Sequence, residues 1–134
     1  MCSSDLGLNR TGVLPALARL LKEGTKASPQ ATAWIAGIAA AVASNLANNL
    51  PIGLIAATTT QTAQVPAHVT GAILIGVNLG PNLSVTGSLA TILWLIALRR
   101  EGESVSALRF LKLGLVIMPP ALLLSLAALS AMSR

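Results

Sequence analysis

The sequence is poor in charged and aromatic residues. Of its 134 residues, only 10% are Asp, Glu, Lys or Arg and only 2% are Phe, Trp or Tyr, whereas 54% are hydrophobic. No charged residue occurs at positions 27–98 or 113–133. The surface of a soluble domain is rich in charged side chains, so these tracts indicate that the solvent is a lipid bilayer. Both tracts are long enough for a spanning helix, which needs about 20 residues.

Groups for acid–base, nucleophilic or metal chemistry are equally scarce. The sequence contains one cysteine, Cys2, and one histidine, His68. A lone thiol forms no internal disulfide, and a lone histidine makes no metal-ligand pair. The four Asp and Glu residues all lie outside the uncharged tracts. We therefore expect no enzyme activity, no cofactor and no metal site, and we interpret His68 as a solvated residue rather than a proton relay.

The net charge of +5 does not indicate a nucleic-acid-binding protein. Most basic residues flank the apolar tracts instead of forming a stripe, and aromatic residues for base stacking are too few. The two basic clusters are Arg19, Lys22 and Lys26, and Arg99, Arg100, Arg109 and Lys112.

The first residues differ from the rest of the chain. Positions 1–6, Met-Cys-Ser-Ser-Asp-Leu, resemble the translated end of a sequencing adapter, and we expect them to be a non-native leader; a native terminus is the alternative. Positions 7–134 are expected to be the C-terminal part of a transporter membrane domain. In positions 7–26, apolar residues recur at helical spacing opposite charged ones, which predicts an amphipathic helix at the membrane interface.

Positions 29–60 predict a re-entrant helical hairpin. Ser28 is a suitable N-cap and Pro29 a suitable first helical residue. The segment 44–51, Ser-Asn-Leu-Ala-Asn-Asn-Leu-Pro, then places polar residues and a proline inside the apolar tract, so we expect the helix to unwind there. The arms on either side are too short to cross the bilayer, which favours a hairpin with a polar tip near its middle.

A second interruption predicts a discontinuous helix over positions 71–98. It follows an expected loop at 61–70, and its break lies at 78–88, Asn-Leu-Gly-Pro-Asn-Leu-Ser-Val-Thr-Gly-Ser. A last transmembrane helix is expected at 113–133, kinked by Pro119 and Pro120.

The two polar breaks are the main functional signal. Each frees backbone carbonyls at the end of one half-helix and N–H groups at the start of the next, and such breaks bind solutes in transporters. Amide and hydroxyl side chains add ligands without the unfavourable burial of a charge. The alternative is that these polar residues only pack helices together, as in a non-transporting membrane scaffold subunit.

At these residues the sequence resembles the bacterial arsenite efflux permeases of the ion transporter superfamily. The resemblance rests on Ser44 to Pro51 and on Leu79 to Trp94. It implies an all-α, polytopic inverted-repeat transporter, of which this chain supplies the re-entrant hairpin and discontinuous helix of the second half. The substrate-binding residues that it implies are Ser44, Asn45, Asn48, Asn49, Asn78, Gly80, Pro81, Asn82, Ser84, Thr86, Gly87 and Ser88. Many relatives carry Asp in place of Asn78, and a neutral amide cannot titrate, so proton coupling is in doubt or lies elsewhere.

The resemblance also implies a function and partners. The full protein is expected to lie in the bacterial inner membrane as a multi-pass exporter of arsenite or antimonite. Its expected partners are the lipid bilayer, the missing N-terminal half and, where one is present, an arsenite-stimulated ATPase. The alternative within transport is a sodium-coupled anion or sodium/proton carrier of the same superfamily. The basic residues of positions 99–112 predict a cytoplasmic loop, and hence a periplasmic C-terminus.

Overall fold

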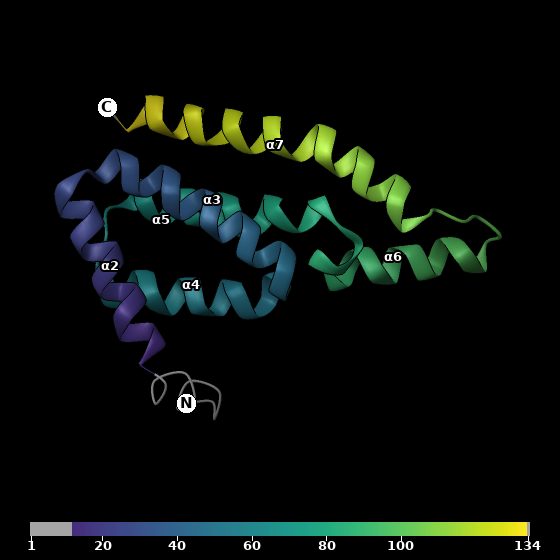
Figure 1. Cartoon of the computed structure of the whole chain (residues 1–134), viewed down its shortest axis with the longest axis horizontal. Helices are drawn as coiled ribbons and strands as arrows, with labels where there is room; N and C mark the ends of the chain where they lie inside the picture. The colour runs from purple at the N-terminus through teal and green to yellow at the C-terminus, as the bar shows by residue number, and fades with distance from the viewer. Residues whose placement is uncertain (1–11, 134) are drawn as a thin grey trace.

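The computed structural model describes residues 12–133, which form a chain of helices (Figure 1). The expected leader at 1–6 and positions 7–11 of the expected amphipathic helix lie outside the described residues. Two short 3-10 turns, η1 (Gly80–Leu83) and η2 (Val85–Gly87), separate α5 from α6. The α-helices are α2 (Val13–Ala27), α3 (Pro29–Ala47), α4 (Asn49–Ala63), α5 (Ala67–Leu79), α6 (Leu89–Arg100) and α7 (Ala107–Met132).

Helix α2 is amphipathic, as predicted. Leu14 and Ala18 are buried one turn apart, whereas Arg19 and Lys22 are exposed. The chain then turns at Ser28, whose hydroxyl oxygen accepts a hydrogen bond from the Ala31 N–H at 3.3 Å. This is the predicted N-cap of α3, and it satisfies one of the N–H groups that the first helical turn leaves unpaired.

The predicted unwinding of positions 44–51 is wrong in extent. Helix α3 continues through Ser44 to Ala47, and only Asn48 is non-helical before α4 begins at Asn49. Asn48 makes this turn with a φ of 73° and a ψ of 149°, a backbone conformation that residues other than glycine rarely adopt. Pro51 does not break the chain because it is the third residue of α4, where its missing N–H has no helical partner to lose.

The predicted loop at positions 61–70 is also wrong. Helix α4 extends to Ala63 and α5 begins at Ala67, so that the connection is residues 64–66. Threonines continue the helix because they bond to its own carbonyls; the Thr60 hydroxyl, for example, donates to the Ala56 carbonyl at 2.9 Å. His68 consequently lies in the first turn of α5 rather than in a loop.

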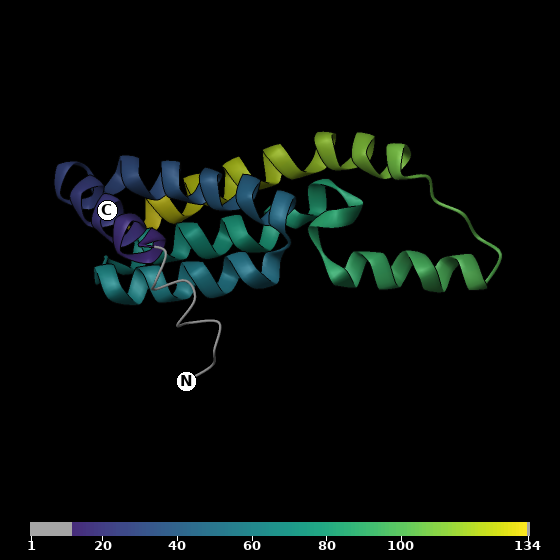
Figure 2. The ribbon, with the colours of Figure 1, turned by 60° about the horizontal axis from the view of Figure 1, so that its bottom comes forward.

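Two separate helices, α5 and α6, flank the second polar segment. Helix α5 ends at Leu79. Two residues of the break have extended backbone conformations: Ser84, between η1 and η2, and Ser88, between η2 and α6. The last helix is longer than predicted because Ser106 caps it, accepting a hydrogen bond from the Arg109 N–H at 3.2 Å. Pro119 and Pro120 lie inside α7, and Figures 1 and 2 show its axis bending near the middle, as expected for prolines within a helix.

The core is built on close contact between α3 and α5. A Cβ atom added to Gly76 would overlap the Gly37 carbonyl oxygen, and one added to Gly80 would overlap the Ala41 carbonyl oxygen. Small residues at four-residue spacing therefore let the two backbones touch, a packing typical of membrane helices. Helix α7 lies across this pair and buries Leu126 against it.

The turn of the α3–α4 hairpin does not reach as far along the molecule as α6 and α7. Figure 1 shows the turn between α3 and α4 beside the α5–α6 break, while α6 and the first half of α7 extend further. The turn at 64–66 and the start of α3 lie at one end of the molecule, and the α6–α7 connection lies at the other.

Within the described residues 12–133, two helices are long and apolar enough to cross a membrane, α3 and α7. Most of each lies outside the core, since 22% and 17% of their most apolar windows are buried. Large apolar side chains consequently face outward, among them Ile35 and Leu124, which are 70% and 72% exposed. The coarse prediction of an all-helical protein with spanning helices is confirmed.

Candidate functional site

The two polar segments meet through one side-chain contact. The Ser84 hydroxyl, between η1 and η2, lies 2.7 Å from Oδ1 of Asn45 near the end of α3. Thr86 Oγ1 lies 3.2 Å from the same Ser84 oxygen. Ser84 has one hydroxyl hydrogen, and the amide oxygen can only accept, so Ser84 donates to Asn45 and accepts from Thr86. The three groups form a directed chain from the break to the hairpin.

Ser44 fixes the end of α3 beside the break. It is fully buried, and its hydroxyl lies 3.1 Å from the Ala41 carbonyl oxygen and 3.4 Å from the Gly76 carbonyl oxygen of α5. This polar contact between helices adds to the backbone packing at Gly80. Asn45, the next residue, is thereby held toward Ser84.

The break folds compactly upon itself. A Cβ atom on Gly87 would lie 2.5 Å from the Pro81 carbonyl oxygen, so only glycine fits there. Gly114 of α7 is similarly close, since a Cβ on it would lie 2.5 Å from the Leu83 carbonyl oxygen. Helix α7 therefore presses directly on the backbone of the break.

The predicted site residues fall into two groups. Four are buried in packing contacts: Ser44, Gly80, Pro81 and Gly87. The others keep exposed or partly exposed side chains around the two segments: Asn45, Asn48, Asn49, Asn78, Asn82, Ser84, Thr86 and Ser88. Two of these bond to their own helix, since Asn78 donates to the Leu74 carbonyl at 2.7 Å and Asn48 accepts from the Leu50 N–H at 3.3 Å.

A cleft of about 260 Å³ lies between the break and α7. One site residue, Asn82, lines it, and the other walls are mainly apolar. Its volume is well above the roughly 10–15 Å³ that one water needs. The cleft is lined by residues that include Leu79, Asn82, Phe110, Leu113, Gly114 and Met118.

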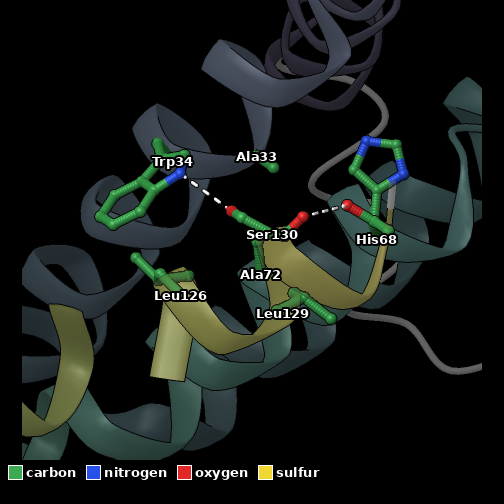
Figure 3. Close-up of a pocket in the computed structure, with 8 residues that line it drawn as sticks. Ala33, Trp34, His68, Ala72, Leu126, Leu129 and Ser130 are labelled. Carbon is green, nitrogen blue, oxygen red and sulfur yellow. Dashed lines mark hydrogen bonds between the residues drawn. The ribbon is translucent and has the colours of Figure 1, made fainter. Parts of the chain in front are cut away.

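A second contact between distant segments lies at the other end of the core (Figure 3). The Trp34 indole N–H of α3 donates to the Ser130 hydroxyl of α7 at 3.0 Å. Figure 3 shows His68 on the opposite side of Ser130 from Trp34, lining the same small pocket. The contact fastens the start of α3 to the end of α7.

Sequence reasoning missed the residues that α7 contributes. Phe110 and Met118 stand in an ordinary apolar run, and nothing in their spacing distinguishes them from lipid-facing residues. Gly114 offered a signal, since an isolated glycine within a helix often marks close backbone approach. Among residues 12–133, no group of three His, Cys, Asp or Glu side chains gathers as metal ligands would.

Comparison with known families identifies the family of the chain. The family model of ArsB, the arsenical pump membrane protein, matches residues 3–132. The chain belongs to the arsenical pump membrane protein family. The match begins inside the six residues expected to be a leader.

Curated members of the arsenical pump membrane protein family align with part of the chain. The arsenical pump membrane proteins of Escherichia coli (strain K12), Shigella flexneri and Yersinia enterocolitica are each 39% identical to it over 59 residues. The alignment covers 44% of this chain and 14% of each relative, so the chain spans a small part of their length. No solved structure matches the chain significantly.

Membership confirms several predictions. The resemblance to arsenite efflux permeases is confirmed at the level of the family. The family consists of membrane pumps and not of enzymes, in agreement with the expectation of no enzyme activity. The expected localisation, a multi-pass protein of the bacterial inner membrane, agrees with this family and with the spanning lengths of α3 and α7.

Proposed function

We propose that this chain is part of the second half of an inverted-repeat transporter that exports arsenite or antimonite across the inner membrane. The observation that carries the proposal is the hydrogen-bonded chain from Thr86 through Ser84 to Asn45. It joins a helix break to the end of a helical hairpin, and paired segments of this kind form solute sites in secondary transporters. The name of the curated relatives, arsenical pump membrane protein, supplies the solute class.

The length of α4 supports a re-entrant hairpin, whereas α3, with 19 residues, is by itself long enough to cross a membrane, so the expectation that both arms are too short is wrong for α3. Helix α7, with 26 residues, is about 39 Å long, whereas α4, with 15, is about 22 Å. The turn between α3 and α4 lies beside the break, about halfway along the molecule (Figure 2). With α7 spanning the bilayer, Asn48 and Ser84 are then near the middle of the roughly 30 Å hydrocarbon layer.

The chemistry of the site suits an uncharged polar solute. Arsenite is mainly a neutral trihydroxide at neutral pH, so it offers hydroxyl donors and acceptors and no fixed charge. Asn45, Ser84 and Thr86 provide matching amide and hydroxyl groups, and Asn82 stands at the neighbouring cleft. Such ligands bind without the strong desolvation that a buried ion requires.

The decisive experiment removes, one at a time, the two partners of the Ser84–Asn45 hydrogen bond in the full-length transporter. Asn45→Ala and Ser84→Ala are each expected to lower arsenite uptake into everted vesicles roughly 3- to 10-fold, because each deletes about one neutral hydrogen bond of 0.5–1.5 kcal/mol. Ser125→Ala is the matched control, since Ser125 bonds only within α7, to the Ala121 carbonyl at 2.8 Å. Uptake by either test variant equal to that of the control contradicts the proposal.

The same vesicles separate the other hypotheses. Loss of uptake when sodium is withdrawn favours the sodium-coupled carrier, and wild-type uptake by all alanine variants favours a scaffold role. The partner ATPase and the N-terminal half of the transporter stay predictions.

A further inference from the structure

A basic cleft lies at the C-terminal end of α4, away from the site above. It has a volume of about 210 Å³ and separates α4 from the polar face of α2. Lys22 and Lys26 lie one helical turn apart on α2, and both side chains line the same cleft. The cleft is lined by Lys22, Thr25, Lys26, Ala63, Gln64 and Val65.

The donors in this cleft suit a phosphate group. None of the described residues that line it is acidic, and Lys22 and Lys26 bring two positive charges. The Gln64 amide adds neutral N–H donors, whereas the Thr25 hydroxyl has already given its hydrogen to the Leu21 carbonyl at 2.7 Å. Charged N–H donors form the stronger hydrogen bonds to anionic oxygens, so the lysines are the main recognition elements.

The outer face of α4 leads from the hairpin turn to this cleft. Leu50 and Leu54 are 67% and 46% exposed, and they stand one turn apart on that face. Ala57 and Gln61 continue the same exposed line toward Gln64. The exposed surface is therefore apolar near the turn and polar near the cleft, the order that a phospholipid presents from its chain ends to its headgroup.

We propose that the cleft binds the phosphate of an anionic phospholipid whose acyl chains lie along α4. The inference rests on the proposed re-entrant hairpin, which places the turn at Asn48 near mid-bilayer. One leaflet contributes about half of the 30 Å hydrocarbon layer. Helix α4, about 22 Å long, then carries its C-terminal end to the depth of the headgroups.

The test measures lipid retention by the purified full-length transporter in detergent, in the absence of arsenite. Native mass spectrometry follows titration with phosphatidylglycerol, with phosphatidylcholine and with sodium phosphate. We expect phosphatidylglycerol to bind more tightly than phosphatidylcholine. The double variant Lys22→Gln/Lys26→Gln is expected to weaken phosphatidylglycerol binding roughly 10- to 30-fold, since each basic residue near anionic lipid contributes about 1 kcal/mol. Arg99→Gln/Arg100→Gln, which removes two charges at the opposite end, is expected to keep wild-type affinity.

Three results overturn the proposal. Equal losses in both double variants indicate general charge attraction, and unchanged binding in Lys22→Gln/Lys26→Gln indicates no site at the cleft. Competition by sodium phosphate at matching concentration indicates a site for soluble anions. The solute proposal fails separately, when Asn45→Ala and Ser84→Ala transport normally while the lipid still binds as expected.

Discussion

At the scale of residues, backbone contact decides more of this structure than side-chain packing. Gly37 and Gly76 bring the α3 and α5 backbones together, and Gly80 does so beside the break. These glycines have a steric role, since a methyl group at Gly76 or Gly80 has no space. Not every helical glycine is of this kind: a Cβ on Gly53 of α4 would meet only the Val77 Cγ1 atom, at an ordinary 3.6 Å.

This difference gives a paired prediction. Gly80→Ala forces a methyl group against the Ala41 carbonyl and is expected to lower stability by about 1–3 kcal/mol, the usual range for overpacking. Gly53→Ala is expected to be neutral or to raise stability by up to about 1 kcal/mol, because alanine is the better helix former. Thermal unfolding of the full-length protein in detergent measures both. Equal midpoints for the two variants would show that α3 and α5 are not in backbone contact.

At the scale of elements, the sequence predicted where helices break more reliably than how far they unwind. A break was predicted at residues 78–88 because proline, glycine and hydroxyl residues occur together there, and the structure interrupts the α-helix at residues 80–88. The length of the unwound segment at the hairpin tip was overestimated. Asn45 is compatible with the last turn of α3, and Asn48 alone makes the turn to α4. The prediction of a loop at 61–70 was wrong because α4 continues to Ala63. The polar threonines fit into this helix, since the Thr60 hydroxyl bonds to carbonyl oxygens of α4 itself.

The candidate site was predictable in its residue types and not in its contacts. Asn45 and Ser84 are 39 positions apart in sequence, and their bond depends on how α3 packs against α5. A residue such as Phe110 becomes informative only when α7 packs against the break.

The bend of α7 yields a prediction at this scale. Pro119 and Pro120 leave the Leu115 and Val116 carbonyls without their helical N–H partners. Pro119→Ala/Pro120→Ala restores both bonds, so the helix is expected to straighten and the distance between spin labels at Leu108 and Met132 to increase. Both label positions are exposed. Double electron–electron resonance measures the distance, with Ser125→Ala as control; an unchanged distance would mean that packing rather than proline bends α7.

At the scale of the whole molecule, the proposed re-entrant hairpin determines which segments share a side of the membrane. The connections at Ser28 and at residues 64–66 lie at one end, and the α6–α7 connection lies at the other. The basic residues near the α6–α7 connection predict that it is cytoplasmic. A reporter fused after Arg134 of the full-length protein is accordingly expected to be active in the periplasm; activity in the cytoplasm would reverse the orientation.

Cysteine labelling distinguishes a re-entrant hairpin from two full crossings. Gln64→Cys and Glu103→Cys are expected to react with a membrane-impermeant maleimide from opposite sides. Ala47→Cys, at the hairpin turn, is expected to resist the reagent from the side where Glu103→Cys reacts, because the turn lies within the bilayer. Rapid labelling of Ala47→Cys from that side would show that α3 and α4 each cross completely.

The glycine contact between α3 and α5 also limits how the transporter moves. Sliding one helix along the other would drive carbonyl oxygens into neighbouring backbone, so the two helices have no soft interface on which to shear. In the proposed transporter, Asn45 and Ser84 are consequently expected to move together as one rigid body. On the other side of the break, α7 touches the backbone at Gly114 and elsewhere borders an open, mainly apolar cleft, which leaves room for movement beside that contact.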